Sequence, residues 1–364
     1  MPSVASCLNT LQHFLSEIYD SSAFQLNKIS FKNQEEWLFQ HGMLSHKTGG
    51  FFHIVGMNDL KNSRDQLYLF QPQSALTGVL ICASLEEPYI LTQARIEPGN
   101  TGVIQLGPTV QSTPANFLRL HKGKKTPYLD LLYSANHQLL GFSSTNHLDL
   151  GKLYYQKTKW LNYGLVDHLV ETEDTFIWVS LSTLAEAARI DYLINTDLRS
   201  LLAVFDWDSL RMNRPPAEDI SPSKILHYFL KQSQTLHCNN RFIDISTSND
   251  LIVTDAGISL RDSPQEIGFY EVKTNHREVQ TWVQPLWRAE GKGRVILLCR
   301  NFKDNPSFLL TVKHEAGTSS SLAISPTYLF YPDENLPQYL DEYTDVLIEF
   351  HQSDEGGRFI NHEY

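Results

Sequence analysis

Apolar residues near the N-terminus recur at steps of three and four positions. The series is Val4, Leu8, Leu11, Phe14, Leu15 and Ile18. An α-helix completes a turn every 3.6 residues, so side chains at this spacing share one face. The pattern predicts an amphipathic helix that packs by that face.

Short apolar and β-branched runs come in pairs farther along the chain. Residues 78–83 and 89–95 flank the polar, proline-containing stretch 86–88, and residues 294–299 and 307–313 flank a similar stretch at 303–306. Two such runs around a short polar connection are typical of an antiparallel hairpin. The pattern therefore predicts two sheet-based units.

Helix signals lie between and after these hairpins. They are a capping box of Thr183 and Glu186, a cap at Asn195 or Thr196 before 198–205, Ser221 with Pro222 before 225–230, and a final helical pattern over 339–350. Two consecutive prolines in 213–217 disfavour regular structure, so this stretch is the best linker candidate.

The two hairpins belong to an internal repeat. Each copy contains a Gln-Pro pair, two apolar runs, a Glu-x-Gly turn and a Pro-Thr pair. The offset is 218 residues both from Glu97 to Glu315 and from Pro108 to Pro326, whereas it is 213 from Gln71 to Gln284. Turn chemistry explains the shared residues, because proline fixes φ and glycine permits positive φ.

A dense run of polar side chains distinguishes the first copy. Its members are Gln93, Arg95, Asn100, Gln105, Gln111, Asn116, Arg119 and His121. Long polar side chains among apolar strands cost free energy unless they face a cleft or pair with one another. We therefore expect the ligand in the first copy.

Composition narrows the function classes. The chain has 364 residues, 41% hydrophobic and 11% aromatic, which is enough apolar surface for real cores and excludes a disordered protein. Its net charge of −11 argues against a nucleic-acid surface, although a local basic pocket for a small phosphorylated ligand remains compatible with it. Four scattered cysteines, no apolar run of membrane-spanning length and no signal-peptide pattern predict a cytoplasmic protein without membrane contact.

Standard cofactor and nucleophile motifs are absent from the sequence. It has no Walker loop, HExxH, complete GxGxxG or GxSxG, and its fourteen histidines include no ligand pair on a predicted helix. We expect no metal and no cofactor.

Residues 93–100, 105–113 and 116–123 resemble the NDP-hexose 2,3-dehydratases of deoxysugar biosynthesis. Further matches are 46–56, Trp178 with Asn195, Asp197 and Arg199, and the segments 277–279 and 282–285. The resemblance implies an α+β fold of two tandem Nudix-like domains, each a mixed sheet flanked by helices. We place the N-terminal domain, with the active site, at 1–205 and a degenerate C-terminal domain at 206–364. The metal box of Nudix hydrolases is missing, because Gln280, Thr281 and Trp282 stand where acidic residues are needed.

The resemblance implies loss of water across C2 and C3 of a dTDP-4-keto-6-deoxyhexose by a homodimer, with the product passed to a separate NADPH-dependent 3-ketoreductase. We assign His121 as base or acid. Glu97 is its counterpart, which requires that burial raise the Glu97 pKa, or the residue that orients it. A structural role for Glu97 at the end of the hairpin stays open, because Glu315 stands at the same place in the second copy. Arg95 and Arg119 offer guanidinium groups to a diphosphate. The other expected substrate contacts are Gln71, Gln93, Asn100, Gln105, Thr109, Gln111 and Asn116.

Thymine recognition needs an aromatic face, which Tyr68, Phe70 or Tyr128 could supply. Two other functions stay open at this level. The chain could be a non-catalytic paralogue that binds a nucleotide sugar or a protein partner, or a related enzyme with another nucleotide or keto-acid substrate.

Overall fold

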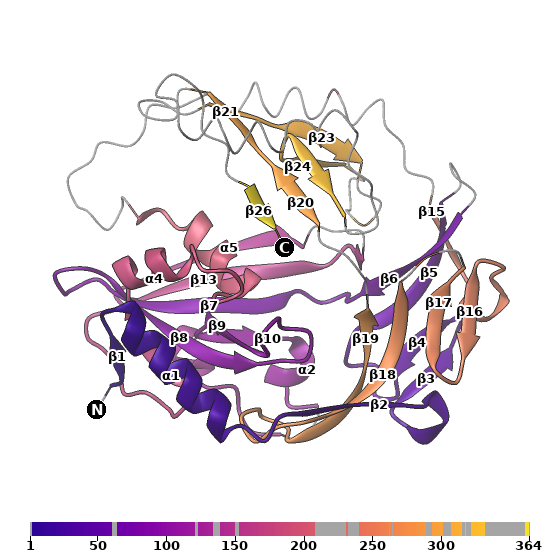
Figure 1. The fold of residues 1–364 in the computed structure, drawn as a ribbon, viewed down its shortest axis with the longest axis horizontal. Coiled ribbons are helices and arrows are strands. Elements are labelled where there is room, and N and C mark those ends of the chain that lie inside the picture. Colours follow the sequence, from indigo (N-terminus) through magenta and orange to yellow (C-terminus); the bar gives the residue numbers. More distant parts are fainter. Residues whose placement is uncertain are drawn as a thin grey trace.

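The computed structural model is a mixed α and β protein built mostly from strands (Figure 1). The residues that it describes are 2–59, 64–120, 123–133, 139–149, 153–207, 231, 240–261, 263, 265–288, 293–300, 307–314, 317, 322–331 and 361–363. Four sequence predictions, namely His121, the linker 213–217 and the helices over 225–230 and 339–350, fall outside these ranges.

An eight-stranded sheet forms the centre of the N-terminal half. Its main path runs β1 (Val4–Ala5), β14 (Phe176–Ser180), β8 (Tyr89–Ile96), β7 (Ala75–Cys82), β13 (Thr158–Val166) and β11 (Gly141–Leu148). Two short strands extend it, because β9 (Ile104–Pro108) pairs with β8 and β10 (Val110–Ser112) pairs with β7. The predicted first hairpin is confirmed, with Leu80 opposite Leu91.

Helices cover both faces of this sheet. One face packs against α1 (Leu8–Ser21), α4 (Leu181–Ala187) and α5 (Thr196–Val204), and the other packs against α3 (Leu129–Tyr133). The predicted N-terminal helix is confirmed through buried Leu11, Leu15 and Ile18, but Val4 lies in a strand beside Trp178. Among the described residues, no helix is long and apolar enough to cross a membrane.

The two predicted helix caps have different outcomes. Asn195 caps α5, because its Oδ1 accepts from the backbone N–H of Leu198 at 2.9 Å. The cap at Thr183 is wrong, since the N-cap is Ser180, three residues earlier, and its hydroxyl accepts from the Thr183 N–H at 3.2 Å. Thr183 is itself a residue of the first helical turn.

Two further sheets lie beside the first. One contains β12 (Tyr154–Tyr155), β6 (Arg64–Phe70), β5 (His53–Asp59), β4 (Met43–His46) and β3 (Trp37–Gln40), and the other contains β16 (Leu251–Thr254), β17 (Gly257–Leu260), β18 (Glu266–Lys273) and β19 (Thr281–Arg288). Single-turn helices η1 (Phe31–Asn33) and η3 (Ile245–Thr247) precede β3 and β16.

The two copies exchange a strand in both directions. Strand β2 (Gln25–Ile29) of the first copy pairs with β18 of the second, and β15 (Asn240–Ile243) of the second pairs with β5 of the first. Figure 1 shows indigo β2 lying along orange β18. Trp37 and Leu44 accordingly share one core with Ile258 and Phe269. Residues on both sides of the predicted division at residue 205 therefore share one core.

Strand register confirms the repeat in detail. The second copy continues as β20 (Arg294–Ile296), β21 (Leu298–Arg300), β22 (Ser307–Leu309), β23 (Thr311–His314), β24 (Leu322–Ser325), β25 (Tyr328–Phe330) and, near the C-terminus, β26 (Asn361–Glu363). Leu298 lies opposite Leu309, as Leu80 lies opposite Leu91, and the pair Thr311 and Ser325 matches the pair Gln93 and Gly107. Each matched residue is shifted by 218 positions.

Candidate functional site

Two adjoining pockets lie where the copies meet. The first, here called the polar pocket, has a volume of about 180 Å³ and is lined by Gln71, Ala75, Thr77, Arg95, Glu97, Gln111, Ser112, Thr113, Asn116, Asp149, Lys157, Lys159, Asp197 and Arg277. The second, here called the aromatic pocket, has a volume of about 410 Å³. Thr113, Asn116 and Arg277 line both, so the two pockets adjoin.

A cluster of two lysines and two aspartates lies in the polar pocket. The Lys159 ammonium is 2.7 Å from Asp149 Oδ1 and 2.7 Å from Asp197 Oδ1, and Lys157 is 3.2 Å from Asp149 Oδ2. All four side chains are less than a fifth exposed. Burial alone would lower the pKa of Lys159, but Asp197 and Asp149 outweigh it and raise that pKa. Lys159 is therefore a fixed cation at neutral pH.

Three local features place this cluster. Lys159 lies in β13, and Lys157 precedes it by two positions, at the start of the same extended segment. Asp149 follows β11, and its backbone N–H donates to the Lys157 carbonyl at 2.9 Å. Asp197 is in the first turn of α5, where a carboxylate also interacts favourably with the helix dipole.

Glu97 links two arginines at the edge of the polar pocket. Its Oε1 accepts from Arg95 Nε at 3.0 Å, from Arg95 Nη2 at 2.6 Å and from Arg277 Nη1 at 2.5 Å. Burial alone would raise the Glu97 pKa, but the two guanidinium groups outweigh it and lower the pKa to about 2. Burial tends to lower the pKa of Arg277, but Glu97 and Glu278 outweigh it and raise that pKa. A raised pKa, the condition for Glu97 to act as acid or base, is therefore not met. The contacts of Glu97 favour its positioning and structural roles, because its carboxylate holds two guanidinium groups in place.

Neutral side chains behind the polar pocket hold two of its lining residues, Gln111 and Arg95, in place. Asn195 Nδ2 donates to Gln111 Oε1 at 2.9 Å, so the residue that caps α5 also fixes the Gln111 amide. Arg95 Nη1 donates to Gln93 Oε1 at 2.7 Å, and Gln93 Nε2 donates to Thr175 at 3.2 Å. These contacts hold the side chains before any ligand arrives.

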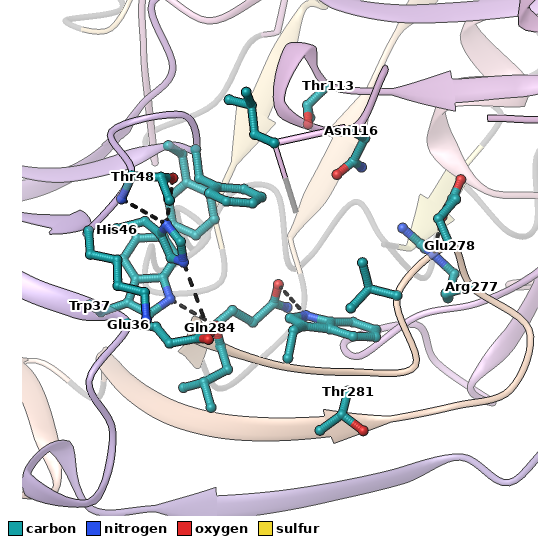
Figure 2. Close-up of a pocket in the computed structure, with 17 residues that line it drawn as sticks. Glu36, Trp37, His46, Thr48, Thr113, Asn116, Arg277, Glu278, Thr281 and Gln284 are labelled. Atoms are coloured by element: carbon teal, nitrogen blue, oxygen red, sulfur yellow. Dashed lines mark hydrogen bonds and ion pairs between the residues drawn. The ribbon is translucent and has the colours of Figure 1, made fainter. Parts of the chain in front are cut away.

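The aromatic pocket combines rings with a polar rim. It is lined by Glu36, Trp37, His46, Lys47, Thr48, Phe51, Phe52, Thr113, Asn116, Leu120, Arg277, Glu278, Val279, Thr281, Trp282, Val283 and Gln284. Figure 2 shows Trp37, His46 and Thr48 on one side and Arg277 with Glu278 across from them. Trp37 belongs to β3, His46 to β4 and Thr48 to the turn that follows β4, whereas residues 277–284 of the second copy supply Arg277 and Glu278.

His46 is held in this pocket by three neighbours. Its Nδ1 lies 2.8 Å from the Thr48 hydroxyl, and its ring meets those of Trp37 and Phe51 edge-on. Burial lowers the pKa of His46, and Glu36, 4.0 Å away, only partly opposes this. The imidazole is therefore mainly neutral at pH 7.

Comparison with known proteins identifies the family. The family model described as NDP-hexose 2,3-dehydratase matches residues 8–205 and 223–364. The chain belongs to the NDP-hexose 2,3-dehydratase family. It is 27% identical to a dTDP-4-dehydro-6-deoxy-alpha-D-glucopyranose 2,3-dehydratase of Streptomyces violaceoruber, over 93% of this chain and 82% of that protein. A protein of Amycolatopsis orientalis with the same name is 25% identical, over 95% of this chain and 78% of that protein.

Within this dehydratase-family chain, the structure brings together five of the predicted site residues. Gln71, Arg95, Glu97, Gln111 and Asn116 line the polar pocket, and Asn116 also lines the aromatic one. These residues are far apart in the sequence, and the pairing of β7 with β8 and with β10 brings them close together in space.

The other predicted residues lie elsewhere. Gln93, Asn100 and Gln105 line neither pocket, and the exposed Arg119 does not either. Thr109 is buried between strands, where its hydroxyl accepts from the Leu80 N–H at 3.0 Å and donates to the Leu91 carbonyl. His121 is outside the described residues, so its assignment stays a prediction.

Sequence reasoning gave no site role to the lysine–aspartate cluster or to the aromatic rings, although Asp197 and Trp282 lie in parts of the sequence that match the family. Tyr68, Phe70 and Tyr128 line neither pocket: Tyr68 is buried with Val55, and the Tyr128 hydroxyl donates to the Glu171 carbonyl at 2.9 Å. The signal in the sequence for the lysine–aspartate cluster was the pair Lys157 and Lys159, because residues two positions apart at the start of a strand point to the same face.

Within the described ranges, no group of three or more His, Cys, Asp or Glu residues could hold a metal ion. The polar pocket offers a fixed ammonium, carboxylates and amides. Such a set can bind hydroxyl and carbonyl groups, stabilise an oxyanion and move a proton.

Proposed function

We propose that this chain is a 2,3-dehydratase of a dTDP-linked 4-keto-6-deoxyhexose. The observation that carries the proposal is the Lys159 ammonium held at 2.7 Å between Asp149 and Asp197 in a pocket next to a larger aromatic one. The names of the related proteins indicate the substrate class.

The reaction begins at C3 of the hexose. The C4 ketone acidifies the C3 hydrogen, and an aspartate of the cluster takes that proton. The electron pair moves into a C3–C4 double bond and leaves an enolate oxygen on C4. Lys159 stabilises this oxyanion, because an ammonium fixed by neighbouring carboxylates needs little reorganisation as charge develops.

Water then leaves from C2. The enolate returns its electrons to form a C2–C3 double bond, the C2–O bond breaks, and the hydroxide takes a proton to become water. The remaining 3-hydroxyl is an enol, which tautomerises to the 3,4-diketone. The reaction involves no net oxidation, so the proton donors and acceptors of the pocket meet its needs. Asp149, Asp197 and His121 are the candidates for the acid.

The test is turnover in deuterated water. Purified protein is given dTDP-4-keto-6-deoxyglucose, with or without a 3-ketoreductase and NADPH, and the products are followed by NMR and mass spectrometry. We expect deuterium incorporation and a 2-deoxy sugar. Lys159→Met should lower kcat by about 100-fold or more, as loss of an oxyanion donor does.

Lys28→Met is the matched control. Lys28 also pairs with a carboxylate, Glu266, at 3.2 Å, but it lies outside both pockets. Its kcat should equal that of the wild type. Binding of dTDP without any exchange or product would reject the dehydratase and support the non-catalytic paralogue.

A further inference from the structure

Three polar residues at the start of α5, namely Asn195, Asp197 and Arg199, have different partners. Asp197 pairs with Lys159 in the polar pocket. Arg199 Nη1 donates to the Ala188 carbonyl at 2.9 Å and so fixes the loop before the helix. Asn195 is 7% exposed and lines neither pocket. Any effect of Asn195 on the polar pocket must therefore pass through a neighbour.

Asn195 sets the direction of the Gln111 amide. A backbone N–H can only donate, so the Leu198 N–H requires the oxygen of Asn195, and Oδ1 accepts from it at 2.9 Å. The amide nitrogen Nδ2 is then left to face Gln111, and this donor requires the Gln111 oxygen, 2.9 Å away. A reversed Gln111 amide would set two donors against each other. The Gln111 NH2 group therefore points away from Asn195.

This NH2 group is available to a ligand. Within the part of the chain that the structure describes, Gln111 Nε2 makes no hydrogen bond and is not buried. Gln111 lies opposite Thr77 on one side of β7, and Lys159 lies opposite Ala75 on the other side. Since Ala75 and Thr77 are two positions apart, they and their partners share one face of the sheet. A ligand that lies over β7 thus meets the Lys159 ammonium from one side and the Gln111 amide from the other.

The arrangement is particular to the first copy of the repeat. A Cβ on Gly107 would lie 3.0 Å from Asn195 Nδ2 and would meet the Arg95 side chain, so glycine leaves the room that Asn195 needs. At an offset of 218 residues, the second copy has Ser325 in place of Gly107, and leucine in place of Gln111. The shared fold therefore does not require the bond between Asn195 and Gln111.

We propose that Asn195 is a positioning residue, which turns the NH2 group of Gln111 into the polar pocket to donate a hydrogen bond to an oxygen of the hexose. This inference rests on the proposed function and deepens it, because it makes one substrate contact a donor. A ketone oxygen can only accept, so a reversed amide would repel it.

Asn195→Asp tests the positioning role. Aspartate caps a helix about as well as asparagine, so the melting temperature should stay close to that of the wild type. Its second carboxylate oxygen cannot donate to Gln111, so the Gln111 amide either reverses or loses its partner. The kcat/KM for dTDP-4-keto-6-deoxyglucose should fall about 5- to 150-fold, the range for one hydrogen bond left unmade in a buried site.

Asn275→Asp is the matched control. Asn275 also uses both ends of its amide, because Oδ1 accepts from the Ala23 N–H at 3.2 Å and Nδ2 donates to the Ser21 carbonyl at 3.1 Å. It lies outside both pockets. The substitution adds the same charge and removes the same donor, and kcat/KM should equal that of the wild type.

Gln111→Leu separates positioning from a general effect of the new charge. Leucine removes the NH2 group, so kcat/KM should fall by a similar factor. Adding Asn195→Asp to Gln111→Leu should cause no further loss, because Asn195 acts through Gln111. A second loss of the same size in the Gln111→Leu background would overturn the inference, and so would wild-type kcat/KM in a folded Asn195→Asp protein.

Titration calorimetry distinguishes failure of this inference from failure of the proposed function. dTDP-glucose has no 4-ketone and cannot undergo the elimination, and dTDP has no hexose. Asn195→Asp and Gln111→Leu should both bind dTDP-glucose more weakly than the wild type does, and dTDP equally well. That result without turnover by the wild type would overturn only the proposed function. Wild-type turnover with additive losses in the double variant would overturn only the inference.

Discussion

Arg277 Nη1 donates to Glu97 Oε1 at 2.5 Å, although the two residues are 180 positions apart and belong to different copies of the repeat. The same carboxylate holds Arg95. One ionised glutamate thus joins the polar pocket to the segment that closes the aromatic pocket.

Glu97→Gln should destabilise the protein in a pH-dependent way. The folded-state pKa of about 2 is below the ordinary value of 4.5, so the carboxylate contributes stability above pH 4.5 that is lost as pH falls toward 2. The difference in unfolding free energy between wild type and Glu97→Gln should be on the order of 3 kcal/mol at pH 7 and should shrink below pH 4.5.

Urea unfolding followed by circular dichroism at pH 7, 4.5 and 3.5 measures this difference. Glu86→Gln, at an exposed glutamate in a loop, is the control and should show no comparable effect. A difference that stays constant across this range would mean that Glu97 is not held ionised by its arginines.

Thr109→Val and Thr327→Val should lose similar stability. Each hydroxyl accepts from a backbone N–H, of Leu80 at 3.0 Å or of Leu298 at 2.9 Å, and donates to a carbonyl 18 positions earlier. A buried unpaired backbone group costs about 1 to 3 kcal/mol. We expect that loss in urea titrations of both variants, with KM altered less than threefold in folded Thr109→Val. A large rise in KM would instead support the substrate contact that the sequence predicts for Thr109.

Lys159 should keep its charge throughout the working pH range. Its pKa is raised above the ordinary 10.5, so the stability that it contributes is complete below pH 10.5 and is lost only as pH rises through the higher folded-state value. The stability difference between wild type and Lys159→Met should be constant from pH 7 to 10, measured by urea unfolding. A decrease within that range would show that the two aspartates do not stabilise the ammonium.

Gly257→Ala should be far more destabilising than Gly102→Ala. Both glycines have positive φ, but a Cβ on Gly257 would lie 1.9 Å from the Ile267 carbonyl oxygen, whereas a Cβ on Gly102 meets nothing within 4 Å. We expect a loss of about 1 to 2 kcal/mol for Gly102→Ala, from backbone strain alone. Gly257→Ala should lose about 3 kcal/mol or more, because backbone must also move. Equal losses in thermal melts would contradict the close approach of β17 and β18.

Local patterns in the sequence were sufficient to predict both hairpins and the buried face of α1. The offset of 218 residues also survives as strand register, down to the matched hydrogen bonds of Thr109 and Thr327. Those matched bonds explain why Thr109 lies between strands and lines neither pocket: the same threonine in both copies holds the shared fold together. Gln111 has Leu329 at its place in the second copy, and it does line the polar pocket.

The sequence by itself determined the repeat, the main strands, the family resemblance and the copy that carries the polar residues. Only the tertiary structure decided how the site is assembled. Exchange of β2 and β15 brings Arg277 and Trp282 to the first copy, and no local periodicity encodes a contact across 180 residues. It also decided the ionisation of Glu97, because a pKa is set by the charges that surround a group in space and not by its neighbours along the chain.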